Sequence, residues 1–423
     1  MKHRVVVTGL GIVAPNGTTV ASFKKSLEEG ISGIRFFPEL AKLNFSCQIG
    51  GMPAISNERK HDYFTPLQLR QFNSNGIMYG VIAGMDALRD AGISPVVKED
   101  PPLWDLGVIF GAGTSGVEKF REAIYKIDKK EVRKLGSTSV VQTMCSGVSA
   151  YLGGMIGAGN TVTSNSSACA TGTEAVIMGF NRIANGLATQ MVCGSCSDDG
   201  PYIWGGFDAM KVTTYKHNEY PTAGSRPLSE TASGFVPSAG AGALVLESLE
   251  SAVRRNATIY AEVLGGAVNN GGQRLDGSMT APNSTAVQRC ITSAVKLADI
   301  SANEIDYING HLTATTKDSL EIENWCEALE RSGSDFPYIN TLKSLVGHGL
   351  AASGSMECVA TILQLYHNFI APNINCEDLH PDISESVAVE RIPREKISTP
   401  LKTAIKASFG FGDVNACVIF RKN

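Results

Sequence analysis

Short apolar runs alternate with amphipathic stretches along most of the chain. Residues 4–11 form a continuous β-branched run closed by glycines, which is typical of a strand buried on both faces. Residues 73–91 repeat apolar positions at helical spacing before Gly92, so this pattern predicts a long amphipathic helix. The same patterns predict further strands at 106–110, 161–163, 190–194 and 241–246, and helices at 22–29, 145–156 and 174–183.

The alternation resumes after a polar segment at 248–256, which we interpret as a boundary. It predicts strands at 258–264, 305–308, 402–409 and 416–420, and helices at 284–298, 319–329 and 354–367. Strands that alternate with helices predict parallel βαβ units and an open sheet covered on both faces. The similar element order predicts a duplicated α/β unit, with an N-terminal half at 1–250 and a C-terminal half at 257–423.

The composition indicates a well-packed globular chain without an electrostatic preference for nucleic acid. The 423 residues carry a net charge of −4, and 43% of them are hydrophobic while 18% are charged. We therefore expect no nucleic-acid partner and no membrane partner. The N-terminal residues lack an apolar segment of signal-peptide length, and no stretch approaches 18 uninterrupted apolar residues, so we expect a cytoplasmic protein.

The ten cysteines are scattered, as is typical of reduced thiols rather than of a disulfide framework. Cys193 and Cys196 form a CxxC pair, which is a spacing found in metal and redox sites. No second pair or nearby histidine pair completes a zinc set, and residues 190–192 favour a buried strand. We therefore predict no metal site.

One cysteine stands out because it lies between a predicted strand and a predicted helix. Cys169 is surrounded by small residues at 165–175, so we expect it on a tight elbow. A thiol at a helix N-terminus feels the positive end of the dipole, which predicts a lowered pKa and a nucleophilic thiolate. Backbone N–H groups at such an elbow can face an oxyanion. The alternative is that Cys169 is a small buried apolar residue, as free cysteines usually are.

Two histidines and a lysine follow in the second half. His311 comes just after a predicted strand, and sites in open α/β sheets lie beyond the carboxyl ends of strands. Lys343 precedes His348 by five residues, and a small-residue helix start follows. The alternatives are a histidine bonded locally in a loop and a solvated surface lysine. The glycine-punctuated residues 407–413 are also compatible with a simple hairpin.

Together, residues 167–172 around Cys169, His311, Lys343 with His348, and the Phe-Gly-Phe-Gly at 409–412 resemble the motifs of β-ketoacyl-acyl-carrier-protein synthases. The closest likeness is to the elongating type II group, and it extends over essentially the whole chain. This resemblance implies a thiolase-like α/β fold in which two duplicated βαβ halves form a five-layered α-β-α-β-α core. It also implies an acyltransferase whose substrates ride on the phosphopantetheine of an acyl carrier protein, without a further cofactor.

The resemblance also implies a role for each site residue. Cys169 would accept the acyl group, while His311 and His348 would promote decarboxylation of a malonyl extender as neutral hydrogen-bond donors. Backbone N–H groups of Cys169 and Phe411 would form the oxyanion hole. Lys343 with Glu357 would orient the site, and Phe411 would be the gate between acyl and malonyl binding. Thr313 and Thr315 would contact the pantetheine, and Phe409 would belong to the substrate surroundings.

Several positions depart from the family pattern. The family's His-Gly-Thr-Gly-Thr reads His-Leu-Thr-Ala-Thr at 311–315, and its Gly-Phe-Gly-Gly-Thr-Asn reads Gly-Phe-Gly-Asp-Val-Asn at 410–415. None of these departures removes a catalytic side chain. They favour a specialised polyene or polyketide pathway, for instance one for an aryl polyene pigment, over housekeeping fatty-acid synthesis. Thr114 stands where elongating members often carry a larger apolar residue, so we expect it to admit a longer or unsaturated acyl chain.

Two other protein classes share features with this sequence. A chain-length-factor partner shapes a chain without condensing it, but such partners typically lack the nucleophile, and Cys169 and both histidines are present. A thiolase-like degradative enzyme would need a second catalytic cysteine, and Cys358 and Cys417 lie within a predicted helix and a predicted strand.

Family members are normally dimers, so we expect a homodimer through the strand at 161–166, with a chain-length-factor heterodimer as the alternative. Carrier proteins are acidic, and a basic cluster formed by Lys129, Lys130, Arg133 and Lys134 is the candidate docking site. The alternative is that this cluster is a solvated helix face.

Overall fold

The computed structural model describes residues 3–423 and contains a large mixed β-sheet. Ten strands follow one another in the order β10-β9-β13-β14-β8-β1-β7-β6-β4-β5. In the N-terminal half these strands are β1 (Val5–Val13), β4 (Leu106–Ala112), β5 (Val162–Thr163), β6 (Gln190–Ser197) and β7 (Gly240–Ser248). In the C-terminal half they are β8 (Ala261–Asn270), β9 (Tyr307–Asn309), β10 (Tyr338–Asn340), β13 (Thr403–Gly410) and β14 (Val414–Arg421).

The two groups of five strands share one topology. In the first group, β5, β4 and β6 are parallel, and β7 and β1 follow with antiparallel pairing. In the second, β10, β9 and β13 are parallel, and β14 and β8 follow with antiparallel pairing. The groups meet where the first residues of β1, Val5 to Val7, pair with the start of β8. The parallel units that we predicted are therefore present, but each half also contains one strand, β7 or β14, that runs opposite to the other four.

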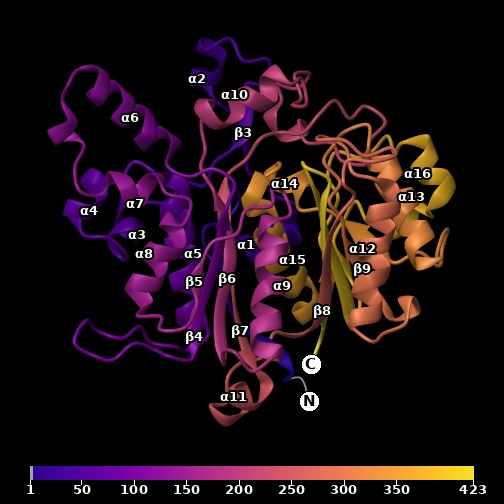
Figure 1. Cartoon of the computed structure of the whole chain (residues 1–423). Coiled ribbons are helices and arrows are strands. Elements are labelled where there is room, and N and C mark those ends of the chain that lie inside the picture. The colour runs from indigo at the N-terminus through magenta and orange to yellow at the C-terminus, as the bar shows by residue number, and fades with distance from the viewer. Residues whose placement is uncertain (1–2) are drawn as a thin grey trace.

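Helices lie on both sides of each group of strands and between them (Figure 1). On the N-terminal side, α5 (Asn75–Asp90) packs on β1 and β7, and α8 (Gly147–Ile156) packs on β4. On the C-terminal side, α12 (Ser284–Leu297) packs on β8 and on α13 (Asp318–Leu329). Between the groups, α9 (Thr171–Ala184) and α15 (Ser353–His367) contact each other and strands of both halves. The chain thus has the predicted α-β-α-β-α layering.

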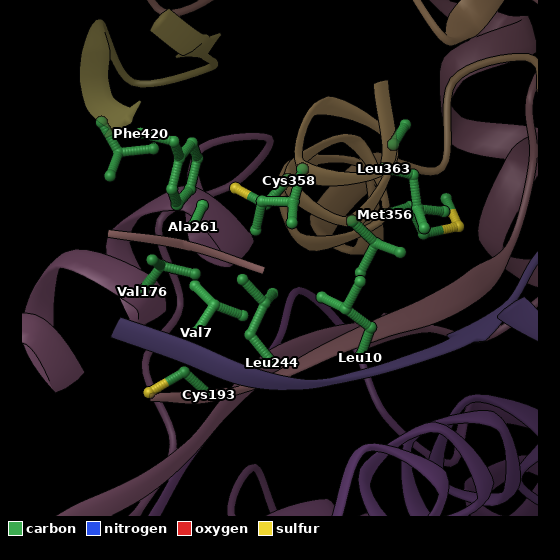
Figure 2. Close-up of a cluster of buried hydrophobic side chains, with 14 of the residues drawn as sticks. Val7, Leu10, Val176, Cys193, Leu244, Ala261, Met356, Cys358, Leu363 and Phe420 are labelled. Atoms are coloured by element: carbon green, nitrogen blue, oxygen red, sulfur yellow. The ribbon is translucent and has the colours of Figure 1, made fainter. Parts of the chain in front are cut away.

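The two central helices share a continuous hydrophobic core with the strands on either side. Figure 2 shows Val176 of α9 and Met356 of α15 packed among side chains of β1, β7 and β14, including Leu10, Leu244 and Phe420. These side chains are completely or almost completely buried. Burying a large apolar side chain stabilises a fold by about 1.5–3 kcal/mol, so this core fixes α9 and α15 relative to both groups of strands.

Glycines allow some of these layers to approach closely. A β-carbon at Gly84 of α5 would lie 2.4 Å from a Leu152 side-chain atom, and one at Gly80 would lie 2.5 Å from Val148. Because Leu152 and Val148 belong to α8, the two helices can pack at this distance only with glycine in α5.

The remaining elements are short and surround the two halves. The further helices are α1 (Val20–Glu29), α2 (Pro38–Lys42), α3 (Asn57–His61), α4 (Pro66–Gln71), α6 (Val117–Asp128), α7 (Ser139–Thr143), α10 (Pro201–Ala209), α11 (Leu249–Arg254), α14 (Lys343–Val346) and α16 (Pro381–Ser386). Two small antiparallel pairs are β2 (Ile34–Phe36) with β3 (Ile49–Gly51) and β11 (Phe369–Ile370) with β12 (Ile397–Ser398). Among residues 3–423, no helix has both the length and the apolar character needed to span a bilayer.

Most predicted elements are present within a few residues of their expected ends. The largest difference is the strand predicted at 258–264, which forms as β8 over Ala261–Asn270. Its polar end, Asn269 and Asn270, pairs with β14 although its composition is typical of a loop. The predicted boundary at 248–256 contains the short helix α11, and the division into halves at 1–250 and 257–423 stays a prediction.

Candidate active site

Cys169 lies on a tight turn that ends at the first residue of α9. Ala168 has φ = 48°, in the left-handed region that disfavours large side chains. The Thr171 hydroxyl holds this turn, because it donates to the Ala168 carbonyl at 2.6 Å and accepts the Ser167 N–H at 2.9 Å. The predicted strand, elbow and helix are therefore present, and the turn presents a partly exposed thiol.

The turn between β13 and β14 lies directly against this elbow. A β-carbon at Gly410 would be 3.1 Å from the Cys169 nitrogen and 3.3 Å from the Ala170 nitrogen, so a larger residue would fit only if the elbow moved by a few tenths of an ångström. The backbone N–H groups of Phe411 and of Cys169 itself donate toward the sulfur. These are the two groups that we expected to form the oxyanion hole.

The two predicted histidines meet the cysteine. The sulfur of Cys169 and a ring nitrogen of each of His311 and His348 all lie within 4.8 Å of one another. The two imidazole rings are nearly perpendicular, with centroids 5.4 Å apart. His311 follows β9 and His348 follows α14, so both come from the C-terminal half and reach a nucleophile of the N-terminal half.

The backbone around His348 fixes the orientation of its ring. The Leu350 N–H donates to Nδ1 of His348 at 3.1 Å, and the Ser353 hydroxyl lies 3.0 Å from the same nitrogen. Leu350 itself has φ = 52°, in the left-handed region. Because Nδ1 accepts a hydrogen bond, the proton of the neutral ring is on Nε2.

The loop that carries His311 is held by two buried carboxylates at the start of α13. Glu321 accepts the N–H groups of His311 at 2.6 Å and Leu312 at 2.7 Å, and Asp318 accepts those of Thr313 at 2.9 Å and Ala314 at 3.1 Å. Leu312 and Ala314 occupy the positions of the family's glycines and have φ of 23° and 61°. The carboxylates therefore stabilise a loop conformation that a non-glycine residue adopts at a cost of about 1–2 kcal/mol each.

Lys343 and Glu357 form an ion pair behind the site. Each residue is only 1% exposed, and the lysine ammonium contacts Oε1 of the glutamate. Neither residue lines the cavity beside Cys169. Glu357 therefore contacts Lys343 and not the cavity.

A cavity of about 230 Å³ opens beside the sulfur and the two imidazoles. It is lined by most of the predicted site residues, namely Cys169, His311, Thr313, Thr315, His348, Phe409 and Phe411. The Thr313 and Thr315 hydroxyls are 3.1 Å apart on its wall. Acidic side chains of α13, Asp318 and Glu321, form part of the same wall.

Thr114 is not part of this cavity. It lines a second cavity of about 380 Å³ together with Cys145, Ser166 and two exposed side chains of α6, Phe120 and Ile124. The structure thus brings together the residues around the nucleophile but separates Thr114 from them.

Burial dominates the electrostatics of the cysteine. It raises the pKa of the Cys169 thiol to about 11, although the Lys343 ammonium and the Phe411 N–H act in the opposite direction. The lowered pKa that we expected from the helix N-terminus is therefore wrong, because desolvation outweighs the favourable charges. The thiol is protonated at neutral pH and needs a base to become a nucleophile.

The two imidazoles are the neutral ring groups closest to the thiol. Burial lowers the pKa of His311 and of His348 well below the usual value, and the Lys343 ammonium lowers both further. Both rings are therefore neutral at neutral pH, as we expected. Burial also raises the pKa of the Glu321 carboxyl group to about 7.

The site can transfer a proton from the thiol and stabilise negative charge on a bound carbonyl oxygen. His311, with a ring nitrogen within 4.8 Å of the sulfur, can accept the thiol proton, whereas Nε2 of His348 already carries a proton and can only donate. Two backbone N–H groups face the same region. Sulfur and imidazole are also zinc donors, so a soft divalent ion could reach the same three atoms.

Several functional residues were not identified from the sequence. Glu321 and Asp318 hold the His311 loop at the cavity wall, and a second buried lysine, Lys406, lies behind the site. Lys406 did give a signal, because it is a charged residue within the apolar strand predicted at 402–409. Asp318 and Glu321 gave a weaker signal in the sequence, because acidic residues are common in the first turn of a helix.

Comparisons with known proteins agree with this geometry. Models of the N-terminal and C-terminal domains of β-ketoacyl synthases match residues 2–252 and 260–377. The chain is 33% identical over 426 residues to 3-oxoacyl-[acyl-carrier-protein] synthase 1 of Buchnera aphidicola subsp. Schizaphis graminum, and the match covers 99% of each chain.

Two solved structures are similar over the full length of both chains. One is a β-ketoacyl synthase from Burkholderia phymatum, with a TM-score of 0.88 and 29% identity. The other comes from a type II polyketide synthase, in which the acyl-carrier protein is in complex with its ketosynthase bound to the hexaketide, with a TM-score of 0.87 and 29% identity.

Proposed function

This chain belongs to the β-ketoacyl synthase family, and we propose that it performs a decarboxylative Claisen condensation with Cys169 as the nucleophile. The chain is an acyltransferase of the 3-oxoacyl-[acyl-carrier-protein] synthase type. The observation that carries the residue assignment is the convergence of the Cys169 sulfur with nitrogens of His311 and His348 within 4.8 Å.

In the first half-reaction, Cys169 takes an acyl group from a carrier thioester. A neutral imidazole accepts the thiol proton, and the thiolate attacks the carbonyl carbon. The backbone N–H groups of Cys169 and Phe411 stabilise the oxygen that becomes negative. The bond to the pantetheine sulfur then breaks, and the imidazolium returns its proton to the departing thiolate.

In the second half-reaction, a malonyl thioester loses carbon dioxide and leaves an enolate. N–H groups of His311 and His348 donate to the enolate oxygen, and removing one such donor typically costs about 10²–10³ in rate. The enolate carbon attacks the acyl carbonyl on Cys169, a carbon–carbon bond forms, and the carbon–sulfur bond breaks. The Cys169 thiolate is then reprotonated, and the longer chain leaves on the carrier.

The other cavity residues would guide the substrate. Thr313 and Thr315 would hydrogen-bond the pantetheine arm, and Phe409 would form an apolar wall beside His311. Phe411 would act as the gate between the acyl and malonyl positions. Thr114, in the second cavity, would then face the far end of the acyl chain and permit a longer or unsaturated chain.

An acyl carrier protein would supply both substrates on its phosphopantetheine. The basic cluster formed by Lys129, Lys130, Arg133 and Lys134 is exposed beyond the end of α6 and suits an acidic carrier. Lys134 already pairs with Glu131 at 2.8 Å, so we expect the other three residues to contribute most.

A homodimer through β5 would cover an otherwise open sheet edge. β5 is the last strand of the sheet, and Val162 on it is exposed. Val140 on α7 is 72% exposed, and Phe120 and Ile124 on α6, which contacts α7, are exposed as well. A second copy of the chain would bury this surface and pair the strand edge.

Non-glycine residues at left-handed positions support a specialised polyene or polyketide pathway. Leu312, Ala314 and Asp413 each replace a family glycine and each have positive φ. A non-condensing chain-length-factor role is not favoured, because the nucleophile and both histidines are present.

The experiment is to incubate the purified protein with malonyl-carrier and a panel of acyl-carriers and to identify the products by mass. Condensation should add two carbons to the acyl chain. His311→Ala should reduce the rate by about 10²–10³, and Thr114→Phe should shorten the longest chain accepted. Products that form equally well with Cys169→Ala would contradict the proposal.

A further inference from the structure

Lys406 is a buried charge that the proposed mechanism does not use. It lies in the middle of β13 and has no exposed surface. Burying an ammonium group is costly unless it is paired, and the carboxylate it meets, Glu357, already pairs with Lys343. Two buried lysines therefore share one buried glutamate, and this arrangement contains more positive charge than pairing requires.

The contacts of Lys406 connect the two halves of the site. Its ammonium lies 2.8 Å from Oε2 of Glu357 on α15, and it donates to the Ala407 carbonyl and to the Ser408 hydroxyl at 3.0 Å. The Ser408 hydroxyl in turn lies 2.9 Å from the hydroxyl of Thr173 on α9, whose N-terminus carries Cys169. The lysine thus joins β13, α15 and the nucleophile helix.

Lys406 also lies beside the strand that leads to His311. In the parallel register of β13 and β9, Lys406 is the partner of Asn309, two residues before the histidine. Its charge lowers the pKa of both His311 and His348. The largest opposing charge on Cys169, by contrast, comes from Lys343. Lys343 therefore acts on the cysteine and on both histidines, whereas Lys406 acts on the histidines alone.

Few other ionisable groups face this ammonium. Those packed around it are Lys343 on α14, Glu357 and Cys358 on α15, Cys417 on β14, and the two active-site histidines. Glu357 is the single carboxylate among them and is shared with Lys343. The buried cluster behind the imidazoles therefore holds two lysines against one glutamate, a surplus of one positive charge.

We propose that Lys406 is a positioning residue that places surplus positive charge behind His311 and His348 and favours the enolate-forming half-reaction over acyl transfer. The inference rests on the proposed function of the same site. Decarboxylation puts a full negative charge on an oxygen held by the two imidazoles, and a fixed positive charge behind them stabilises that charge as it develops. Acyl transfer places its developing charge at the backbone N–H groups instead.

The test compares Lys406→Met, which keeps the length of the side chain without its charge, with Lys406→Arg, which keeps the charge. One assay measures acyl transfer to Cys169 from acyl-carrier by intact mass, and a second measures release of carbon dioxide from malonyl-carrier. Lys119→Met is the control, because Lys119 is also a buried lysine in an ion pair but belongs to α6.

Lys406→Met should slow release of carbon dioxide by about 10- to 100-fold, the loss that removal of an outer partner of a metal ligand typically causes. Acyl transfer should change by less than about threefold, Lys406→Arg should recover at least part of the lost rate, and Lys119→Met should behave like the wild type. Equal losses in both half-reactions, or no recovery with arginine, would overturn the proposal.

Two further outcomes are distinguishable from these. If the wild-type protein neither takes up acyl groups nor releases carbon dioxide, the proposed function itself has failed. If Lys406→Met does not fold, Lys406→Gln provides the neutral comparison. Failure of both neutral variants to fold would identify Lys406 as a folding determinant and would also overturn the proposal.

Discussion

Glu321 accepts the backbone N–H of His311 at 2.6 Å, so a carboxylate on α13 fixes the position of a histidine on a neighbouring loop. The second oxygen of the same carboxylate accepts the Leu312 N–H at 2.7 Å. One side chain therefore holds two consecutive peptide groups whose conformation would otherwise be strained. The His311 ring depends on this support, because its Nδ1 has no hydrogen-bond partner within the described part of the chain.

Replacing Glu321 should accordingly loosen the histidine loop. Glu321→Ala leaves two buried N–H groups unpaired, at about 1–3 kcal/mol each, and should lower both the thermal midpoint and the condensation rate. Glu323→Ala, an exposed substitution in the same helix, is the control and should change neither. A Glu321→Ala protein with the wild-type rate would show that the loop holds its shape without the carboxylate.

The protein should be more stable with glycine than with alanine at position 314. The φ of 61° at this position is unfavourable for alanine, and glycine adopts this conformation without a steric cost. Ala314→Gly should therefore raise the free energy of unfolding by about 1 kcal/mol, which corresponds to a rise of about 1 °C in the thermal midpoint of a chain of this size. Ala54→Gly, at an exposed position without positive φ, should be neutral or slightly destabilising. Equal shifts in both variants would rule out strain at Ala314.

Asp413 should hold the segment 271–283 against the cavity. Its carboxylate accepts the N–H groups of Gln273 at 2.9 Å and Asn283 at 2.8 Å, and Thr280 of this segment lines the cavity. Asp413→Ala should release the segment, accelerate tryptic cleavage after the exposed Arg274, and raise KM more than it lowers kcat. Asp335→Ala, which removes an exposed carboxylate elsewhere, should leave cleavage unchanged. Unchanged cleavage in Asp413→Ala would mean that other contacts retain the segment.

The reactivity of Cys169 should keep increasing as the pH is raised well above neutrality. Its pKa of about 11 means that the thiol is protonated below that pH and becomes a thiolate as pH increases. Without substrate, alkylation of Cys169 by iodoacetamide should therefore rise by about tenfold per pH unit between pH 7 and 10. Peptide mapping distinguishes this reaction from alkylation of the exposed Cys145. An alkylation rate that levels off below pH 8 would contradict this prediction, because it would mean that the pKa of Cys169 is lower than its burial implies.

The sequence predicted the elements of this fold well because most of them leave a local pattern. The apolar run at 4–11 appears as β1, and Cys169 lies on the expected elbow because small residues separate a strand from a helix. The directions of the strands were harder to predict from the sequence. The antiparallel pairing of β7 with both β1 and β6 depends on how connections cross the sheet, which hydrophobic periodicity does not record.

The supporting residues of the site were harder to predict for a physical reason. Glu321 is a charged residue whose burial depends on the folded His311 loop, so neither composition nor spacing reveals it. The position of Lys406 in an apolar strand indicates burial, but its partner Glu357 is known only from the assembled fold. The left-handed conformations of Leu312 and Ala314 also leave no local signal, because glycine is the residue that usually indicates positive φ. The pKa of Cys169 depends on burial in the assembled fold, which outweighs the local helix dipole.

The most direct test of the central claim is a two-step intact-mass measurement on Cys169. Acyl-carrier alone should add one acyl group to the protein, and peptide mapping should locate it on Cys169. Malonyl-carrier should then remove that group, release one carbon dioxide per acyl group, and yield a carrier-bound product two carbons longer. An acyl group on another residue, or an acyl-Cys169 that persists after malonyl-carrier is added, would contradict the account.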